Sequence, residues 1–463
     1  MNLKKTLSIV LSGLIAVSML SACDKKESDS TDNGKVREMT SNELVHDMGL
    51  GWNLGNTLDV CNADRSGNGS VDEHADEVDE TLWGNPKATK ELFEALKDDG
   101  VKSVRIPVTW RDHLGEAPEY KINDEWMDRV QEVVDYAREC GMYVIINLHH
   151  DGGDDVDFGA WIKKADKDYD GVIEKYKALW AQIAERFKDY SDYLVFESMN
   201  EVGYDNIPQE DGIALVNKIN QEFVNLIRTT GGNNDKRHLL IAGYWTDITR
   251  SCQGIVMPKD SADRCILSVH YYTPWQFCIN GDPATWGSEG EINELNRLFD
   301  MLKTNFTDNG VPVILGEYGV NSAAEDESRI YWCESVVKKC TELGIATFFW
   351  DNGEEVDRNT YKWRTDGLLD ALKRASSGDD YTVEPPKAKE PSDSITDETK
   401  IIELHDFTGR QIDEVLEKYE GFLNIKVIEE ENKEAKSGEI LKQDQIEGKF
   451  ITRGETLNLT VAK

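Results

Sequence analysis

Short apolar runs alternate with amphipathic helical patterns along most of the 463-residue chain. Nearly continuous apolar runs are typical of parallel strands that are buried on both faces. Eight runs are strand candidates: Leu50–Leu54, Ser103–Pro107, Tyr143–Leu148, Tyr193–Glu197, His238–Ala242, Cys265–His270, Val311–Glu317 and Ala346–Trp350. This alternation constrains the fold more than any other feature of the sequence.

Helical faces lie between the strand candidates, and they are marked by apolar residues at helical spacing. They include Trp126/Val130/Val133/Val134/Ala137, Tyr176/Leu179/Trp180/Ile183/Phe187 and Leu215/Ile219/Phe223/Leu226. The weakest helical pattern is between Gly243 and Arg264. Eight strands with intervening helices over roughly 330 residues predict an α/β fold, a (β/α)8 TIM barrel with loop insertions. A doubly wound open sheet is the alternative, but no GxGxxG follows the first strand.

Composition shifts divide the chain into five segments. We expect a signal peptide at residues 1–22, a polar tether at 23–39, the barrel at 40–375, an acidic linker with prolines at 376–400 and a small α+β module at 401–463. The module is expected to be strand, helix, strand, strand. Gln411–Tyr419 has a helical pattern, whereas Asn424–Glu429 and Thr456–Ala462 alternate as strands do.

The N-terminus has the pattern of an export signal. Lys4 and Lys5 precede an apolar run from Leu7 to Leu20, which has the length of a signal h-region rather than a membrane span. Leu20-Ser21-Ala22-Cys23 resembles the lipobox of bacterial lipoproteins. We therefore expect a cell-surface protein whose only membrane contact is a lipid on Cys23. A plain secretory signal is the alternative.

The charge balance excludes some classes of partner. There are 52 Lys and Arg against 88 Asp and Glu, a net charge of −36. Nucleic-acid binding needs a basic face, so no nucleic acid is expected as a partner. Neutral substrates remain compatible with this charge. The seven cysteines after Cys23 are scattered and odd in number, which does not indicate a disulfide framework or a zinc site.

Polar and aromatic residues follow the apolar runs at the ends where a TIM barrel places its active site. They are Asn53, Arg105, His149, His150, Asn200, Glu201, Trp245, His270, Tyr272, Glu317 and Trp350. Two carboxylates on separate strands suit glycoside hydrolysis, in which one protonates the leaving oxygen and the other attacks the anomeric carbon or activates water. Carboxyls about 5–5.5 Å apart would give retention and about 6.5–9.5 Å inversion.

Eight motifs resemble glycoside hydrolase family 5, which includes the endo-β-1,4-glucanases. They are Gly51–Asp59, Trp83–Pro86, Val104–Trp110, Ile145–His150, Phe196–Glu201, Val269–Trp275, Leu315–Gly319 and Phe349–Gly353. The resemblance covers residues 45 to about 370 and is greatest to subfamily 4, whose members act on cellulose, mixed-linkage β-glucan and xyloglucan. Val202 departs from the family's usual proline, which affects loop stiffness rather than chemistry.

The resemblance implies catalytic roles for the two carboxylates. Glu201 would be the acid/base and Glu317 the nucleophile, with Arg105 and Tyr272 in contact with Glu317. Asn200 would bind the sugar 2-hydroxyl, and Trp350 would stack under the ring.

The remaining substrate-binding residues by this resemblance are Asn53, His149, His150 and His270. His149 and His270 would line the cleavage subsite. Neither a cofactor nor a metal is implied.

The function expected from these residues is a retaining endo-β-1,4-glucanase that cleaves cellulose or mixed-linkage β-glucan by double displacement. A xyloglucanase or mannanase of the same family is the alternative within the enzyme class. A non-catalytic glycan-binding surface lipoprotein is the alternative outside it. Intact Glu201 and Glu317 argue against the non-catalytic alternative.

Other residues have competing structural interpretations. His149 and His150 are adjacent strand residues in this prediction and would point to opposite faces, which does not suit one metal ion. Glu197 is expected to be structural. The acidic loop at residues 62–70 lacks the bidentate Glu of an EF-hand. Four loop tryptophans are candidate sugar platforms: Trp83, Trp161, Trp245 and Trp275.

The terminal module resembles a PASTA domain in Asp406–Gly409, Lys436–Leu441 and Arg453–Leu457. That resemblance implies a contact with peptidoglycan. His405 and Gln445 stand where proline is common in the family. A spacer without a ligand is the alternative.

Overall fold

The computed structural model describes residues 34–62, 78–153, 159–386, 401–419, 421–432, 435–445 and 449–463. The chain divides into two compact units between Pro385 and Pro386. The expected signal peptide with Cys23, all but the first residue of the acidic loop at 62–70, and the linker from residue 387 to 400 lie outside the described residues.

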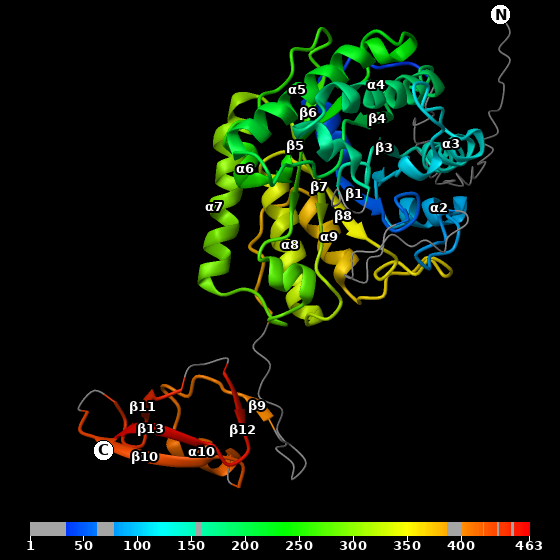
Figure 1. The fold of residues 1–463 in the computed structure, drawn as a ribbon. Coiled ribbons are helices and arrows are strands. Elements are labelled where there is room, and N and C mark those ends of the chain that lie inside the picture. Colours follow the sequence, from blue (N-terminus) through cyan, green and yellow to red (C-terminus); the bar gives the residue numbers. More distant parts are fainter. Residues whose placement is uncertain are drawn as a thin grey trace, which may run out of the picture. The chain divides into compact units, whose positions relative to one another are not determined.

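The first unit is a closed barrel of eight parallel strands in the order of the chain, as Figure 1 shows in part. The prediction of a (β/α)8 barrel is confirmed. The strands are β1 Leu50–Leu54, β2 Ser103–Ile106, β3 Tyr143–Asn147, β4 Leu194–Glu197, β5 Leu239–Asp247, β6 Cys265–Tyr271, β7 Val313–Tyr318 and β8 Ala346–Asp351. The barrel closes where β1 pairs with β8, from Leu50 opposite Thr347 to Leu54 opposite Asp351.

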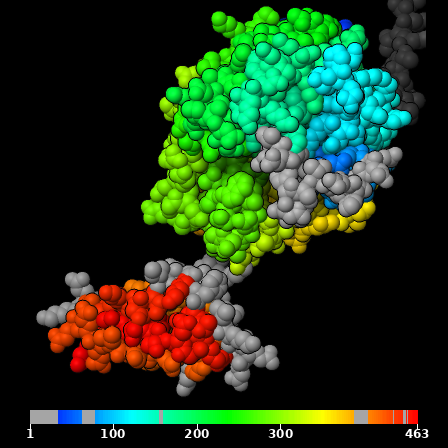
Figure 2. All heavy atoms as spheres, in the orientation of Figure 1, coloured from blue at the N-terminus to red at the C-terminus, as the bar shows by residue number. Residues whose placement is uncertain are grey.

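Nine α-helices belong to the described part of this unit. They are α1 Ser41–Met48, α2 Lys90–Asp98, α3 Asp124–Glu139, α4 Tyr169–Arg186, α5 Gln209–Ile227, α6 Ile248–Cys252, α7 Glu289–Asn305, α8 Asp326–Glu342 and α9 Leu368–Ser376. Their predicted apolar faces pack inward, for example Trp126 and Val130 of α3. In Figure 2 the colours follow one another around this unit because helices adjacent in the chain are neighbours in space. No helix within the described ranges has the length and apolarity to cross a bilayer.

Strand β5 runs five residues beyond the predicted Ala242. Its pairing with β6 shifts register between Ala242 and Asp247. Trp245 and Thr246 have positive φ angles of 56° and 48°, and Glu201 after β4 has one of 45°. Left-handed backbone in non-glycine residues is costly and is found mostly at functional sites. Here all three residues lie on the carboxyl-terminal side of the barrel strands.

The opposite end of the barrel is closed by α1 and a buried arginine. Arg237, just before β5, is completely buried. Its guanidinium donates to the Asn234 side chain and to backbone carbonyls. The carbonyl acceptors belong to Phe187, Tyr190, Ser191 and Leu194. The neighbouring His238 contacts Ser41 of α1 through a 2.9 Å hydrogen bond. These contacts join the start of β5 to the segment that leads into β4.

The second unit is a small α+β module with its own apolar core. Its elements are β9 Ile401–Glu403, α10 Ile412–Tyr419, β10 Asn424–Glu430, β11 Ile440–Gln443, β12 Phe450–Thr452 and β13 Thr456–Ala462. Strand β13 lies between β10, which is parallel to it, and β11, which is antiparallel. The expected order of strand, helix, strand, strand was wrong because it missed β11 and β12, which are too short to show alternation.

Candidate active site

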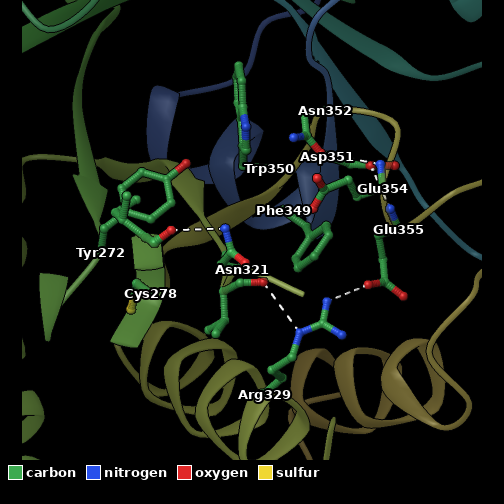
Figure 3. Close-up of a pocket in the computed structure, with 13 residues that line it drawn as sticks. Tyr272, Cys278, Asn321, Arg329, Phe349, Trp350, Asp351, Asn352, Glu354 and Glu355 are labelled. Carbon is green, nitrogen blue, oxygen red and sulfur yellow. Dashed lines mark hydrogen bonds and ion pairs between the residues drawn. The ribbon is translucent and has the colours of Figure 1, made fainter. Parts of the chain in front are cut away.

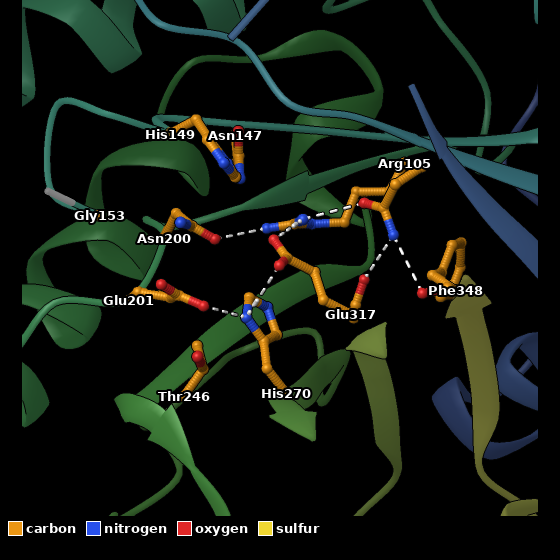
Figure 4. A network of polar contacts seen from close by, with 12 residues as sticks. Arg105, Asn147, His149, Gly153, Asn200, Glu201, Thr246, His270, Glu317 and Phe348 are labelled. Atoms are coloured by element: carbon orange, nitrogen blue, oxygen red, sulfur yellow. Dashed lines mark hydrogen bonds and ion pairs between the residues drawn. The ribbon is translucent and has the colours of Figure 1, made fainter. Parts of the chain in front are cut away.

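Arg105 of β2 is the centre of a buried polar network, shown in Figure 4. Its Nε donates to Glu197 Oε2 at 2.7 Å, and its Nη2 donates to Asn200 Oδ1 at 2.8 Å. Nη1 donates to Glu317 Oε1 at 2.7 Å and to Asn53 Oδ1 at 3.0 Å. The planar guanidinium thus fixes four side chains from the ends of three other strands, β1, β4 and β7.

The two predicted carboxylates face each other across His270. Its Nδ1 lies 2.8 Å from Glu201 Oε1 and 3.6 Å from Glu317 Oε2. Carboxylate oxygens accept hydrogen bonds, so Nδ1 carries the proton and donates it to Glu201, while Glu317 lies just beyond hydrogen-bond distance. Tyr272 donates its hydroxyl to Glu317 Oε2 at 3.0 Å. The Glu201 side chain is 34% exposed, whereas that of Glu317 is 6% exposed.

His149 has a defined tautomer in this network. Asn147 Oδ1 accepts from the Val108 backbone N–H, which fixes the amide orientation. Asn147 Nδ2 then donates to Glu197 and lies 3.2 Å from His149 Nδ1. His149 Nδ1 must accept, which leaves the imidazole proton on Nε2. His149 can therefore donate a hydrogen bond from Nε2.

The spacing of the carboxylates determines which chemistry the site can perform. One carboxylate oxygen of Glu201, one ring nitrogen of His270 and one carboxylate oxygen of Glu317 lie within 4.8 Å of one another. Carboxyl groups about 5–5.5 Å apart leave no room for a water between them and suit a retaining glycosidase, whereas inversion needs about 6.5–9.5 Å. The geometry therefore fits attack by one carboxylate on a substrate that the other protonates.

Comparison with known proteins agrees with this geometry. A family model described as cellulase, glycosyl hydrolase family 5, matches residues 67–356. Endoglucanase A of Ruminococcus albus is 42% identical over 366 residues, covering 74% of this chain and 95% of the relative. The chain belongs to glycoside hydrolase family 5.

Solved structures of similar family 5 proteins share the barrel. A GH5-4 broad specificity endoglucanase from Bacteroides salanitronis is 35% identical with a TM-score of 0.65, over 74% of this chain and 97% of that one. A family 5 xyloglucanase from Paenibacillus pabuli is 33% identical with a TM-score of 0.65, over 72% of this chain and 99% of that one. The similarity therefore spans the barrel in both cases and includes proteins with different named substrates.

Opposing influences act on Glu317 in this family 5 site. Burial raises the pKa of the Glu317 carboxyl above its ordinary value, while the charges of His270 and Arg105 oppose that rise. Burial, together with the Glu317 charge, also holds the pKa of Tyr272 well above its ordinary value. Tyr272 therefore remains a hydrogen-bond donor to Glu317 at any working pH.

Two predicted ligand-binding residues of the family 5 chain lie behind the cleft rather than in it. Asn53 and Arg105 are both completely buried. Asn53 Nδ2 donates to the carbonyls of Gly316 and Phe348, and its Oδ1 accepts from Arg105. The expected contact of Arg105 with Glu317 is confirmed. Neither Asn53 nor Arg105 has exposed surface, so both position other side chains here, and a contact of either with substrate stays a prediction.

His149 and His150 do not point to opposite faces of a strand, contrary to the prediction. Strand β3 ends at Asn147, so strand alternation does not apply, and the two rings lie 4.6 Å apart and nearly perpendicular. Ligand atoms of Asp59, His149 and His150 lie within 4.8 Å of one another. The proton on His149 Nε2 occupies the position that would bind an ion, which disfavours a metal in this tautomer.

The tryptophans of the cleft differ in exposure. Trp350 is half-buried and stacks on His149 with ring centroids 5.8 Å apart. Trp245 and Trp275 line a cavity of about 450 Å³ beside Glu201. Trp275 is 62% exposed and offers a sugar platform, whereas Trp161 is 7% exposed and donates to buried Asp151. Trp161 is therefore corrected to a structural residue. Trp83 packs edge-on against His150.

Two residues without a predicted role hold the site together, and a third lies beside it. Asn147 and Ser268 both donate to the buried Glu197, which agrees with a structural role for that carboxylate. Thr246 is completely buried beside Glu201 in Figure 4. Asn147 could have been found because it ends an apolar run, but Ser268 and Thr246 carry no such signal.

Proposed function

We propose that this chain is a retaining endo-β-1,4-glucanase in which Glu317 is the nucleophile and Glu201 the acid/base. The observation that carries the proposal is the pair of carboxylates, which have one oxygen each within 4.8 Å of the other, together with the ion pair between Glu317 and the buried guanidinium of Arg105. Arg105 and Tyr272 favour the charged form of Glu317, as a nucleophile requires. Glu201 is the more exposed and can reach both leaving group and water.

The reaction proceeds in two displacements on this geometry. In the first, a Glu317 oxygen attacks the anomeric carbon, and Glu201 gives its proton to the departing glycosidic oxygen. In the second, Glu201 removes a proton from water, which attacks the same carbon and releases Glu317. His270 links these charges, because its Nδ1–H donates to Glu201 and lies 3.6 Å from Glu317, near enough to strengthen toward whichever carboxylate is negative.

The substrate proposed is a neutral β-1,4-linked glucan, either cellulose or mixed-linkage β-glucan. Aromatic platforms at Trp350 and Trp275 suit the apolar faces of glucose rings. Asn200 and His149 supply polar groups for hydroxyls, with Asn200 assigned to the 2-hydroxyl. Xyloglucanase activity is the second candidate, since a 33% identical relative carries that name. A mannanase is a third.

Release of reducing ends from barley β-glucan, carboxymethylcellulose, xyloglucan and mannan tests the proposal. We expect the wild type to act on a glucan and Glu317→Ala to be inactive. On an aryl β-cellobioside, whose leaving group departs without protonation, azide should rescue Glu201→Ala and yield a β-glycosyl azide, because the covalent intermediate still forms. No activity from well-folded wild type would instead favour a glycan-binding protein.

We also propose that the protein is a surface lipoprotein anchored through Cys23 and that residues 401–463 are a PASTA-like module in contact with peptidoglycan. The lipobox-like sequence supports the anchor, and the compact core of the module supports an independent unit. Partition of the wild type, but not of Cys23→Ser, into detergent would test the anchor. Pull-down on peptidoglycan by the full chain, but not by a chain ending at Pro385, would test the module.

A further inference from the structure

Exposed apolar side chains gather on the small module. Five large apolar side chains are exposed among the described residues, and three of them belong to the module: Leu416, Val427 and Ile428. In the barrel unit, by contrast, aromatic residues such as Tyr272 and Trp350 line the cavity at the ends of β7 and β8 (Figure 3). Val427 and Ile428 are neighbours on β10 and are 43% and 53% exposed. Adjacent exposed apolar residues indicate an interaction surface.

Strand β10 is an edge of the three-stranded sheet of the module (Figure 1). Its only strand partner in the described part of the module is β13, and six of its seven residues are exposed. The Asn424 N–H donates to the Glu455 carbonyl, and the Glu430 carbonyl accepts from the Lys463 N–H. The even-numbered residues of β10 therefore direct their backbone groups toward β13, and the odd-numbered residues direct theirs outward. Another β10 can pair antiparallel with this edge only if odd residues lie opposite odd residues.

The charges on β10 match those of a second copy in one such register. Lys426 and Glu430 lie two residues before and after Ile428, with all three side chains on the same face. In an antiparallel pair centred on Ile428, Lys426 of each copy lies opposite Glu430 of the other. These are positions without ladder hydrogen bonds, where opposed Cα atoms are about 4.5 Å apart and side chains interact most closely. Glu429, on the other face, is already paired with Lys463 at 3.3 Å.

The same charges oppose the neighbouring registers. A shift of two residues in either direction places Lys426 or Glu430 opposite the apolar Ile428. A shift of four places like charges opposite each other, which is destabilising. Charged side chains on an edge strand normally prevent its pairing with other chains. On β10 they do so in each of these registers except the one centred on Ile428.

We propose that β10 pairs antiparallel with β10 of a second copy of this chain, about a twofold axis at Ile428. The second copy is the partner because its own Lys426 and Glu430 supply the complementary charges. The twofold axis uses both open edges, so the assembly stops at a dimer. Because the interface is one strand wide, the dimer is weak. It would join two catalytic units, which could hold one polysaccharide at two places and slow its release.

Sedimentation equilibrium of the full chain at about 0.15 M salt tests the pairing. The net charge of −36 opposes approach of two copies, but charges more than about 8 Å apart are largely screened under these conditions. We expect a reversible dimer to form between about 1 µM and about 300 µM protein. Lys426→Glu and Glu430→Lys each place like charges opposite each other twice. Each should raise the Kd of the dimer at least about tenfold.

Mixing the two variants gives the decisive measurement. Each variant then meets the opposite charge at both positions of the other, so the mixture should dimerise with a Kd within about threefold of wild type. Restoration by mixing would also show that both variants are folded. Lys442→Glu is the matched control, because it makes the same change at an exposed lysine of β11, the other edge of the sheet. It should leave the Kd unchanged.

Three results would overturn the dimer and leave the proposed function standing. The first is a chain that stays monomeric over the whole concentration range. The second is a dimer that neither single variant weakens, which would place the contact on another surface. The third is a mixture of the two variants that fails to dimerise, which would exclude the register centred on Ile428.

Discussion

Each end of the barrel buries an arginine, but one arginine binds mainly backbone carbonyls and the other binds side chains. Arg237 donates to four backbone carbonyls and an amide oxygen, so it fixes the chain itself. Arg105 donates to the side chains of Glu197, Glu317, Asn53 and Asn200. A contact to backbone cannot change without moving the fold, whereas a contact to a carboxylate can change with its charge. The comparison separates an end built for stability from an end built for reaction.

The largest effect should come from Glu317→Gln. Loss of the nucleophile should lower kcat on barley β-glucan at least about 10³-fold. The midpoint of thermal unfolding should not fall, since the change removes a buried charge that faces Glu201. Activity assays and thermal unfolding of the same preparation measure both. A large loss of stability would show that the reactive end also holds the fold together.

Arg237→Met should lower the stability of the protein and leave its activity nearly unchanged, the opposite of Glu317→Gln. Five hydrogen bonds from a buried charged group would be lost, and each such bond contributes about 1.5–3 kcal/mol. We expect the free energy of unfolding to fall by about 4 kcal/mol or more, with kcat of the folded fraction nearly unchanged. Arg297→Met, at an exposed arginine paired with Glu294 on the same helix, is the control and should change stability by less than about 0.5 kcal/mol. Equal unfolding curves for the two variants would contradict the comparison.

His270→Gln should move the acid limb of the pH profile. Glu317 must be ionised to attack, and burial raises its pKa, so activity is lost as pH falls through a value above the ordinary 4.5. The His270 charge opposes that rise, and its removal should shift the acid limb of kcat/KM further upward. An acid limb below pH 4.5 in the wild type, or one that His270→Gln leaves in place, would exclude Glu317 as the group that titrates.

The smallest effect concerns His238 at the stable end. Burial, helped by Arg264, Arg228 and Arg37, lowers the pKa of His238 to about 3. The histidine stays neutral in the fold but is protonated at about pH 6.5 when unfolded. The contribution of neutral His238 to the free energy of unfolding is therefore fully present above pH 6.5. It decreases as pH falls toward 3, and the loss is about 2 kcal/mol at pH 5.

Chemical denaturation at pH 7 and pH 5 measures that loss. His238→Gln should reduce the difference between the two pH values, whereas His46→Gln, at an exposed position of α1, should not. If both variants keep the wild-type difference, the acid sensitivity of the barrel comes from another group.

The sequence predicted the strands well because each is a short apolar run that is buried on both faces. The predicted fifth strand ended at Ala242, five residues before the end of β5, because the left-handed Trp245 and Thr246 interrupt the alternation. Residue types at the strand ends identified the catalytic carboxylates as candidates, but their separation depends on how strands far apart in the chain are placed. Burial of Asn53 was not predictable for the same reason: its carbonyl acceptors come from β7 and β8.

The seam between β1 and β8 has a consequence for how the protein is made. It pairs Leu50–Leu54 with Thr347–Asp351, so the first strand cannot complete its pairing until the last strand has been synthesised. Until about 350 residues have been synthesised, the growing chain has at most an open sheet whose two edges can pair with other chains. Synthesis of β8, rather than folding of any early segment, therefore sets the moment at which the catalytic network can assemble, and a chaperone that shields those edges would act before that moment.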